Sequence, residues 1–264
     1  MTQGQVVQQV KVTSDDEIGK LAAAFNRMSQ EVTRVNQLRR QMTADIAHDL
    51  RTPLTVIAGY IESMQDGVLQ PTPQRLALIY AEIQHLQNLV GDLRMLSLVD
   101  AGELSLNPQK LSPKILLDRS ATLFRNQADQ GDVSIDVEAD ESLPEIMVDE
   151  VRMGQVFGNL LSNALRYTPQ GGKIILSAQI AADKVDIMVR DTGTGIEPEE
   201  LPNIFDRFHR ADKSRHTETG ESGLGLAIVK ALVESQGGTA WAESSPGVGS
   251  TFHLVFPLCR SIIK

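Results

Sequence analysis

His48 is the residue of this chain whose type and surroundings are best suited to chemistry. The run Asp45–Leu54 is typical of a helix, in which Ile46 and Leu50 share one face because they are four residues apart. His48 is two positions from each, about 200° round the helix, so its imidazole is expected on the opposite, solvated face beside Asp49. Such an imidazole, ionisable near neutral pH and next to a carboxylate, can act as a nucleophile. The alternative is a surface histidine without a function.

A second set of candidate residues lies on a helix expected from Asp149 to Tyr167. Asn159, Asn163 and Arg166 share one face of this helix, and its apolar residues occupy the opposite face. Carboxamides and a guanidinium can contact phosphate, and Asn163 can offer its side-chain oxygen to Mg²⁺. The stripe therefore suits a nucleotide, although an ordinary solvated stripe is the alternative.

Two glycine-containing loops add to this set. Asp191–Ile196 follows an expected strand, and its glycines permit positive φ and close approach of the backbone to a ligand. Asp191 can accept a hydrogen bond from an exocyclic amine such as that of adenine. The second loop, within Gly220–Lys230, enters a helix whose first backbone amides form an anion site. It matches neither the Walker pattern nor the dinucleotide fingerprint. Alone, the first loop also fits an ordinary turn, and the second also fits a glycine-rich helix entry that allows tight packing.

A polar segment separates the two glycine loops. Ile204–Arg210 is followed by the run Ala211–Glu221, which contains no apolar anchor. This composition predicts a mobile lid that becomes ordered when nucleotide binds. His209 and His216 fall in this region and are expected on the surface of the lid.

Two long helices are expected to position His48. Ser14–Glu17 resembles a capping box, and apolar residues three and four apart continue from there to Met64, with a break in phase after Val35. A loop follows, and a second helix has its apolar seam at Leu76, Ile79, Ile83, Leu86, Val90 and Leu93. One hairpin cannot cover its own seam well, so we expect two copies to form a four-helix bundle. The alternative is a monomer whose hairpin packs on its own C-terminal domain.

The remainder of the chain mixes helical and strand periodicity, as α/β layered domains do. The prolines and asparagine between Gly102 and Pro113 predict a linker and a candidate hinge. Beyond it, helices are expected at 116–127, 149–167 and 224–235, and strands at 133–137, 146–148, 173–180, 184–190, 239–243 and 251–256.

The composition excludes some classes of function. The chain has 264 residues and a net charge of −9, and no block of Lys or Arg favours a nucleic-acid partner. Its one cysteine, Cys259, cannot form an internal disulfide, which favours a reducing compartment and an inert thiol. No apolar run of about eighteen residues and no signal peptide is visible, so the chain as given is not expected to span a membrane. It can still be the soluble part of a longer protein.

Taken together and in order, these segments resemble the sensor histidine kinases of two-component systems over nearly the whole chain. Each motif is weak alone, but the ordered combination is specific. The opening segment, through Asp15–Met28, resembles the latter half of a HAMP signal-transmitting module. The family's histidine, asparagine, first glycine, phenylalanine, second glycine and third glycine boxes are matched, in that order, by Asp45–Leu54, Asn159–Thr168, Asp191–Ile196, Phe205–Phe208, Gly223–Lys230 and Gly247–Phe252.

The resemblance implies an α+β protein of two domains. An antiparallel helical hairpin forms a dimeric four-helix bundle, and an α/β sandwich of the gyrase and Hsp90 type follows, with a mixed sheet and helices on one face. The implied divisions are a partial HAMP segment at 1–35, the dimerisation and histidine-phosphotransfer hairpin at 36–105, and the ATP-binding domain at 106–264. ATP and Mg²⁺ are the implied cofactors. A second copy and the receiver domain of a response regulator are the implied partners, on the cytoplasmic side of a membrane to which absent segments anchor the full-length protein.

The resemblance also implies roles for individual residues. His48 is the phosphoacceptor, Asp49 is its base or orienting partner, and Thr52 matches the position that places water for phosphatase action on the regulator. Asn163 is the expected Mg²⁺ ligand, and Asp191 recognises adenine. The other implied nucleotide-site residues are Asn159, Arg166, Tyr167, Gly193, Gly195, Ile196, Phe205, Arg207, Gly223, Leu224, Gly225, Leu226 and Thr251.

The reaction expected from this resemblance is transfer of the γ-phosphate of ATP to His48 and then to an aspartate of a response regulator. One alternative is an ATPase of the same fold that opens and closes mechanically and does not need His48. The other is a non-catalytic scaffold, or a protein that acts chiefly as a phosphatase through Thr52. One departure is Glu221, which stands where the family usually has glycine and is expected to face solvent in the lid.

Overall fold

The computed structural model describes residue 10, residues 16–209 and residues 222–259. The chain divides into two compact units, Met1–Gln84 and His85–Lys264. The expected cap at Ser14, the lid over residues 211–221 and the departure at Glu221 lie outside the described residues. None of the helices found among the described residues has the length and apolar character needed to cross a membrane.

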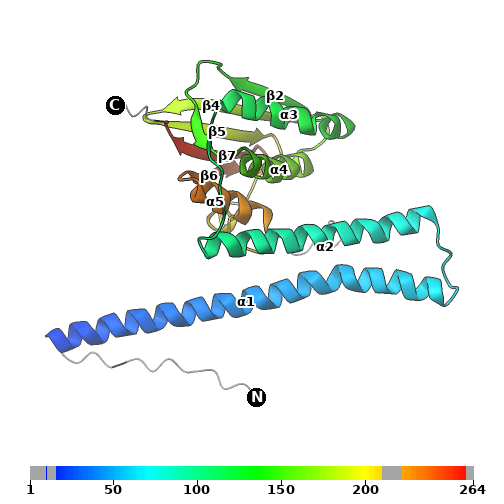
Figure 1. Cartoon of the computed structure of the whole chain (residues 1–264), viewed down its shortest axis with the longest axis horizontal. Helices are drawn as coiled ribbons and strands as arrows, with labels where there is room; N and C mark the ends of the chain where they lie inside the picture. The colour runs from blue at the N-terminus through cyan, green and yellow to red at the C-terminus, as the bar shows by residue number, and fades with distance from the viewer. Residues whose placement is uncertain (1–9, 11–15, 210–221, 260–264) are drawn as a thin grey trace. The chain divides into compact units, whose positions relative to one another are not determined.

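The first unit is built on α1 (Glu17–Gln65), which Figure 1 shows as one continuous helix. The helix ends at a loop where Gly67 adopts a φ of 72° and the amide of Leu69 donates to the carbonyl of Ser63 at 2.9 Å. After the loop, α2 (Pro73–Asp100) returns antiparallel to the end of α1 (Figure 1). The expected helical hairpin is confirmed, and α2 continues from His85 into the second unit.

The second unit contains a mixed five-stranded sheet in the order β2-β4-β5-β7-β6. β2 and β4 are parallel and the other neighbours are antiparallel. β4 and β5 form the expected hairpin, as do β6 and β7. The strands are β2 (Ser134–Ala139), β4 (Lys173–Ala181), β5 (Lys184–Asp191), β6 (Thr239–Ser245) and β7 (Gly249–Pro257).

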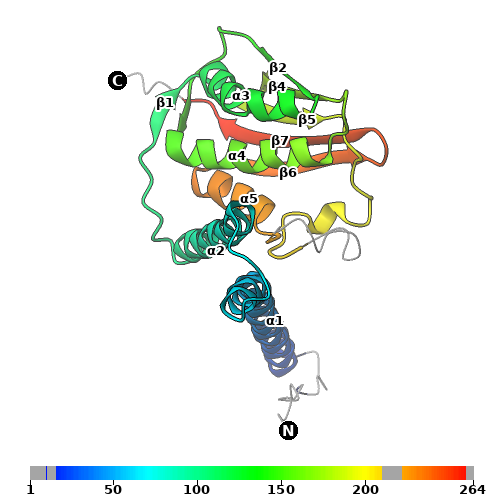
Figure 2. The ribbon, with the colours of Figure 1, turned by 90° about the vertical axis from the view of Figure 1, so that its right-hand side faces the viewer.

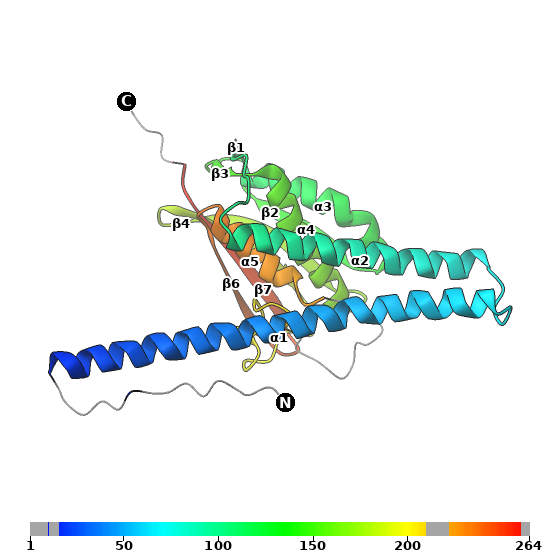
Figure 3. The same cartoon turned by 60° about the horizontal axis from the view of Figure 1, so that its bottom comes forward.

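Three helices cover one face of this sheet: α3 (Pro113–Gln130), α4 (Glu150–Tyr167) and α5 (Gly225–Ser235), as Figure 2 shows. α4 and α5 lie side by side (Figure 3). Asp149 caps α4, as expected, by accepting a hydrogen bond from the amide of Arg152. The α+β prediction with helices on one face is therefore confirmed. The core between helices and sheet includes Met153, Phe157, Leu160, Leu161, Ile174, Leu176, Ile187 and Phe256.

The linker contains a strand that the sequence did not predict. β1 (Gln109–Leu111) pairs antiparallel with β3 (Ile146–Val148). The amide of Asn107 also donates to the carboxylate of Asp149 at 2.8 Å. The strand was missed because only Leu111 of its three residues is apolar, so the segment shows no strand pattern. A second unexpected element is the short 3₁₀ helix η1 (Leu201–Asn203).

Candidate functional site

His48 lies on the exposed face of α1, as its spacing predicted. Its neighbours Ile46, Asp49 and Leu50 are half-buried. The hydroxyl of Thr52, one helical turn further on, donates to the main-chain carbonyl of His48 at 3.2 Å. The imidazole and this hydroxyl are therefore both presented on open helix surface, where a large partner can reach them.

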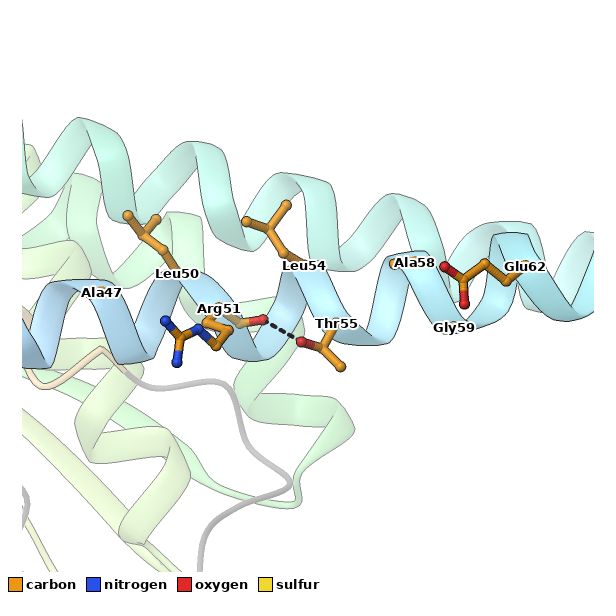
Figure 4. A pocket seen from close by; sticks show the side chains of 8 residues that line it. All are labelled: Ala47, Leu50, Arg51, Leu54, Thr55, Ala58, Gly59 and Glu62. Atoms are coloured by element: carbon orange, nitrogen blue, oxygen red, sulfur yellow. Dashed lines mark hydrogen bonds between the residues drawn. The ribbon is translucent and has the colours of Figure 1, made fainter.

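An open groove of about 610 Å³ runs along the same part of α1 (Figure 4). Leu50 and Leu54 point to one side of the helix, and Leu54 is 53% exposed. The hydroxyl of Thr55 donates to the carbonyl of Arg51 at 2.9 Å. Most of the lining is aliphatic or small, which indicates a packing surface rather than a catalytic cavity. The lining residues are Ala47, Leu50, Arg51, Leu54, Thr55, Ala58, Gly59 and Glu62.

Asp191 is a buried carboxylate at the end of β5, with 5% of its surface exposed. Its Oδ1 accepts hydrogen bonds from the amides of Gly193 at 2.8 Å and Ser250 at 3.2 Å. Burial raises the pKa of this carboxyl above its ordinary range, and the two amide bonds oppose that rise. No described residue bonds to Oδ2, so a fixed acceptor remains for a ligand amine.

The loop after Asp191 is packed so closely that it requires glycine. A Cβ on Gly193 would lie 2.6 Å from the carbonyl oxygen of Tyr167, the last residue of α4. That same carbonyl accepts a hydrogen bond from the amide of Thr194 at 3.1 Å. Gly195 has a φ of 72°, and a Cβ there would overlap the carbonyl of Ser245. The sequence-predicted glycines therefore fix the loop between α4 and the β6–β7 turn.

The N-terminus of α5 lies against the polar stripe of α4. A Cβ on Gly225 would be 3.6 Å from Oδ1 of Asn159, and both Asn159 and Asn163 are half-buried. Gly223 reaches this position with a φ of 64°, and the buried Leu224 anchors the turn in the core. Free amides at a helix start and carboxamides on the adjacent helix together suit an anionic ligand.

The structure places the other predicted site residues on α4, α5 and the segments beside them. Arg166 and Tyr167 are exposed on the last turn of α4, and Leu226 is half-buried on the first turn of α5. The ring of Phe205 packs edge-on against Phe252, with centroids 6.4 Å apart. Ile196 is tied to the sheet, since its amide donates to Oγ of Ser244 at 2.8 Å.

The register of β7 places Ser250, rather than the predicted Thr251, beside Asp191. Asp191 pairs with Ser250 and Arg190 pairs with Thr251. Because successive strand residues face opposite sides, Thr251 points to the sheet face away from the helices. Residues two apart in a strand share a face, so Ser250 lies on the same side as the buried Phe252. This alternation was the sequence signal that could have identified Ser250.

Arg207 is bound to a residue that the sequence did not connect with it. Its two terminal nitrogens, Nη1 and Nη2, donate to Oδ2 and Oδ1 of Asp100 at 2.8 and 2.6 Å. Asp100 is the last residue of α2. The predicted nucleotide-site arginine is therefore held, in this structure, by the helix that precedes the domain.

The described residues contain no cluster of three or more His, Cys, Asp or Glu side chains that could hold a metal ion. This does not test Asn163 as a Mg²⁺ ligand, because Mg²⁺ keeps several waters and binds substrate phosphates with one or two protein groups. The carboxamide oxygen of Asn163 has the hard character that the ion prefers.

Three family models match successive parts of the chain. Residues 1–34 match the HAMP domain, and residues 38–102 match the His Kinase A (phospho-acceptor) domain. Residues 148–260 match the histidine kinase-, DNA gyrase B- and HSP90-like ATPase. The chain belongs to the sensor histidine kinases. In this family member His48 falls within the phospho-acceptor match and Asp191 within the ATPase match.

Individual relatives agree with this assignment. The signal transduction histidine-protein kinase BaeS of Escherichia coli (strain K12) is 37% identical over 259 residues, which are 98% of this chain and 55% of BaeS. The chain thus spans about half the length of that relative. The structure of the Acinetobacter baumannii histidine kinase AdeS has a TM-score of 0.69 and 27% identity, covering 81% of this chain and 98% of that chain. Full-length ShkA in complex with AMPPNP has a TM-score of 0.62 and 27% identity, covering 84% of this chain and 46% of that one.

Proposed function

We propose that this chain phosphorylates itself on His48 with ATP and passes the phosphoryl group to an aspartate of a response regulator. The observation that carries the proposal is the exposed His48, next to Asp49, inside the segment that matches the phospho-acceptor model. The same chain carries a buried carboxylate, a glycine-packed loop and a helix N-terminus in a domain of the ATPase family.

The chemistry requires a neutral ring nitrogen on His48. Its lone pair attacks the γ-phosphorus, the bond to the β–γ bridging oxygen breaks, and ADP leaves with that electron pair. Asp49 accepts a hydrogen bond from the other ring nitrogen, which selects the reactive tautomer and stabilises the positive charge that forms on the ring. In the second step the carboxylate of the regulator attacks phosphorus and the P–N bond breaks, which restores the neutral imidazole.

The nucleotide is held, in this proposal, by groups of the second unit. Asp191 accepts a hydrogen bond from the adenine amine, and the first amides of α5 together with Asn159 contact the phosphates. Asn163 would be the protein ligand of Mg²⁺, which when bound offsets charge on the phosphates. Arg166, Tyr167 and Arg207 line the outer part of this site.

We propose that two copies pair through the helical hairpin. Leu76, Ile83 and Val90 recur every seven residues on α2 and are 52, 38 and 54% exposed in the single chain. Leu54 in the groove of α1 is exposed to a similar degree. Apolar residues at this spacing on one helix face suit a neighbouring helix. Light scattering at micromolar concentration should report twice the chain mass, and a single-chain mass would contradict the pairing.

The HAMP match at residues 1–34 supports a further part of the proposal. We infer that the full-length protein is a membrane-associated sensor and that the domains described here act on the cytoplasmic side, with the receiver domain of the regulator as their partner. Detergent-free fractionation of cells that express the full-length protein should recover it with membranes, and recovery in the soluble fraction would contradict the anchoring.

Thr52 favours a second activity, removal of phosphate from the regulator. Its hydroxyl lies on the exposed surface one turn from His48 and can orient a water molecule there. Thr52→Ala should slow dephosphorylation of a phosphorylated regulator at least about tenfold and leave labelling of His48 intact. Equal dephosphorylation by the two proteins would exclude this role.

Incubation with γ-labelled ATP tests the principal proposal. The wild type and His85→Gln, the control for loss of a histidine elsewhere on the hairpin, should both acquire label, and His48→Gln should not. The label should be labile in acid and stable in alkali, as expected of a phosphoramidate. Label that persists in His48→Gln would refute the assignment and favour an acceptor elsewhere.

A further inference from the structure

Asp100 and Arg207 join the end of α2 to the segment between the two glycine loops. The pair is bidentate, with both nitrogen–oxygen distances at 2.8 Å or less. The Arg207 side chain is 28% exposed and that of Asp100 is 54% exposed. An arginine fork on a carboxylate is more specific than a single exposed ion pair, yet solvent access keeps it weak enough to open.

The same half of α2, from His85 onward, makes further contacts within the second unit. Arg152 of α4 approaches the sulfur of Met95, with Nη1 3.7 Å from Sδ. A crevice of about 250 Å³ lies beside this contact and is lined by residues of α2, α3, α4 and α5. Its lining includes Asn159, which also lies against the N-terminus of α5. The C-terminal half of α2 therefore lies beside Asn159, which the proposed function assigns to the phosphates.

We propose that the carboxylate of Asp100 competes with ATP for the guanidinium of Arg207. This inference rests on the proposed function. A guanidinium binds a carboxylate and a phosphate through the same two donors. Arg207 therefore cannot form this bidentate contact with Asp100 and with a triphosphate at the same time. ATP binding replaces the carboxylate by phosphate, and this releases the end of α2 from the domain. We call the Asp100–Arg207 ion pair the latch. It is formed without nucleotide and is broken when nucleotide binds.

The latch ties nucleotide binding to domain movement. Transfer to His48 requires the γ-phosphate to lie in line with the imidazole, and any movement of the nucleotide domain away from the end of α2 must break both hydrogen bonds. By linkage, a contact that ATP must displace lowers the affinity for ATP, and its removal raises that affinity by the same factor. For a partly exposed pair this factor is about two to five.

Asp100→Asn tests the latch, since it removes the charge but keeps the size of the side chain. The control is Glu103→Gln, which makes the same change in net charge at an exposed position three residues away. Calorimetric titration with a non-hydrolysable ATP analogue and Mg²⁺ should show two- to fivefold tighter binding to Asp100→Asn than to Glu103→Gln. The conservative Asp100→Glu should bind like the wild type.

A second readout follows the end of α2 directly. Without nucleotide, amides near residues 96–106 should exchange with deuterium faster in Asp100→Asn than in Glu103→Gln. The analogue should speed exchange there in the wild type and not in Asp100→Asn. Equal or weaker analogue binding by Asp100→Asn, or exchange unaffected by the analogue, would overturn the latch. Neither measurement needs phosphoryl transfer, so tight binding with no label on His48 would refute the proposed function alone.

Discussion

The surroundings of His48 and of Asp191 differ in almost every physical respect. His48 stands on an exposed helix face, and its neighbours on α1 form an open groove. Asp191 is 5% exposed, bound by two backbone amides and enclosed by glycines that leave no room for a Cβ. A group that must meet two different partners needs access, whereas a group that recognises one small molecule needs a fixed and desolvated position.

Two glycines with the same backbone angle provide the sharpest test of this contrast. Gly67 in the hairpin loop and Gly195 in the nucleotide loop both have a φ of 72°. A Cβ on Gly67 would meet nothing within 4 Å, and one on Gly195 would overlap the carbonyl of Ser245. Gly67→Ala should therefore cost about 1 kcal/mol of unfolding free energy, and Gly195→Ala about 4 kcal/mol or more.

Urea unfolding of the two variants measures this difference. The backbone strain is equal at the two positions, so any difference between the variants reports the close packing around Gly195. An equal loss of unfolding free energy in both variants would contradict that packing difference. If Gly195→Ala destabilises only the nucleotide domain, with α1 still helical by circular dichroism, the difference between the two regions would be supported further.

The next largest effect is expected from two aspartates on the same strand. Asp191→Asn keeps an acceptor oxygen for the amides of Gly193 and Ser250 but removes the charge that, in the proposed function, binds the adenine amine. Its affinity for ATP should fall about 10- to 100-fold. Asp186→Asn is the matched control, because Asp186 is 6% exposed on β5 but its carboxylate bonds to His253.

Titration with an ATP analogue distinguishes these two aspartates. Unchanged affinity in Asp186→Asn and weak binding in Asp191→Asn are expected. A similar loss in both variants would mean that charge or stability, rather than contact with adenine, controls the affinity.

A smaller effect is expected from Asp92, which lines the crevice at α2. Burial raises the pKa of Asp92 to about 6 from 3.8, and the charge of His85 opposes that rise. The other residues lining the crevice are uncharged, although Arg152 approaches nearby at Met95. Because the folded state binds this proton more tightly, the contribution of Asp92 to stability is greatest below about pH 4 and falls as the pH rises through about 6.

Asp92→Asn should remove this pH dependence. Since the carboxyl is partly solvated, the difference between wild type and variant should change by no more than about 1 kcal/mol between pH 4 and pH 7. Urea unfolding at several pH values measures it. A wild type that gains stability relative to Asp92→Asn over this range would contradict the assigned direction.

Much of the fold followed from the sequence because each helix and most strands carry a full period of apolar residues. The capping Asp149 and the exposed His48 followed from local geometry alone. β1 was missed because only Leu111 of its three residues is apolar, whereas the equally short β3 is apolar throughout. Ser250 was missed because a shift of one residue in a strand exchanges the two faces. The pairing of Arg207 with Asp100, 107 residues apart, depends on tertiary structure that no local pattern encodes.

The most direct test of the account is to locate the phosphate on the chain. Wild-type protein incubated with ATP and Mg²⁺, digested under alkaline conditions and analysed by mass spectrometry, should carry a phosphoryl group on His48 only. Asp191→Asn, treated in the same way, should carry much less at the same position. Phosphate found on another residue, or none on a protein that binds ATP, would contradict the account.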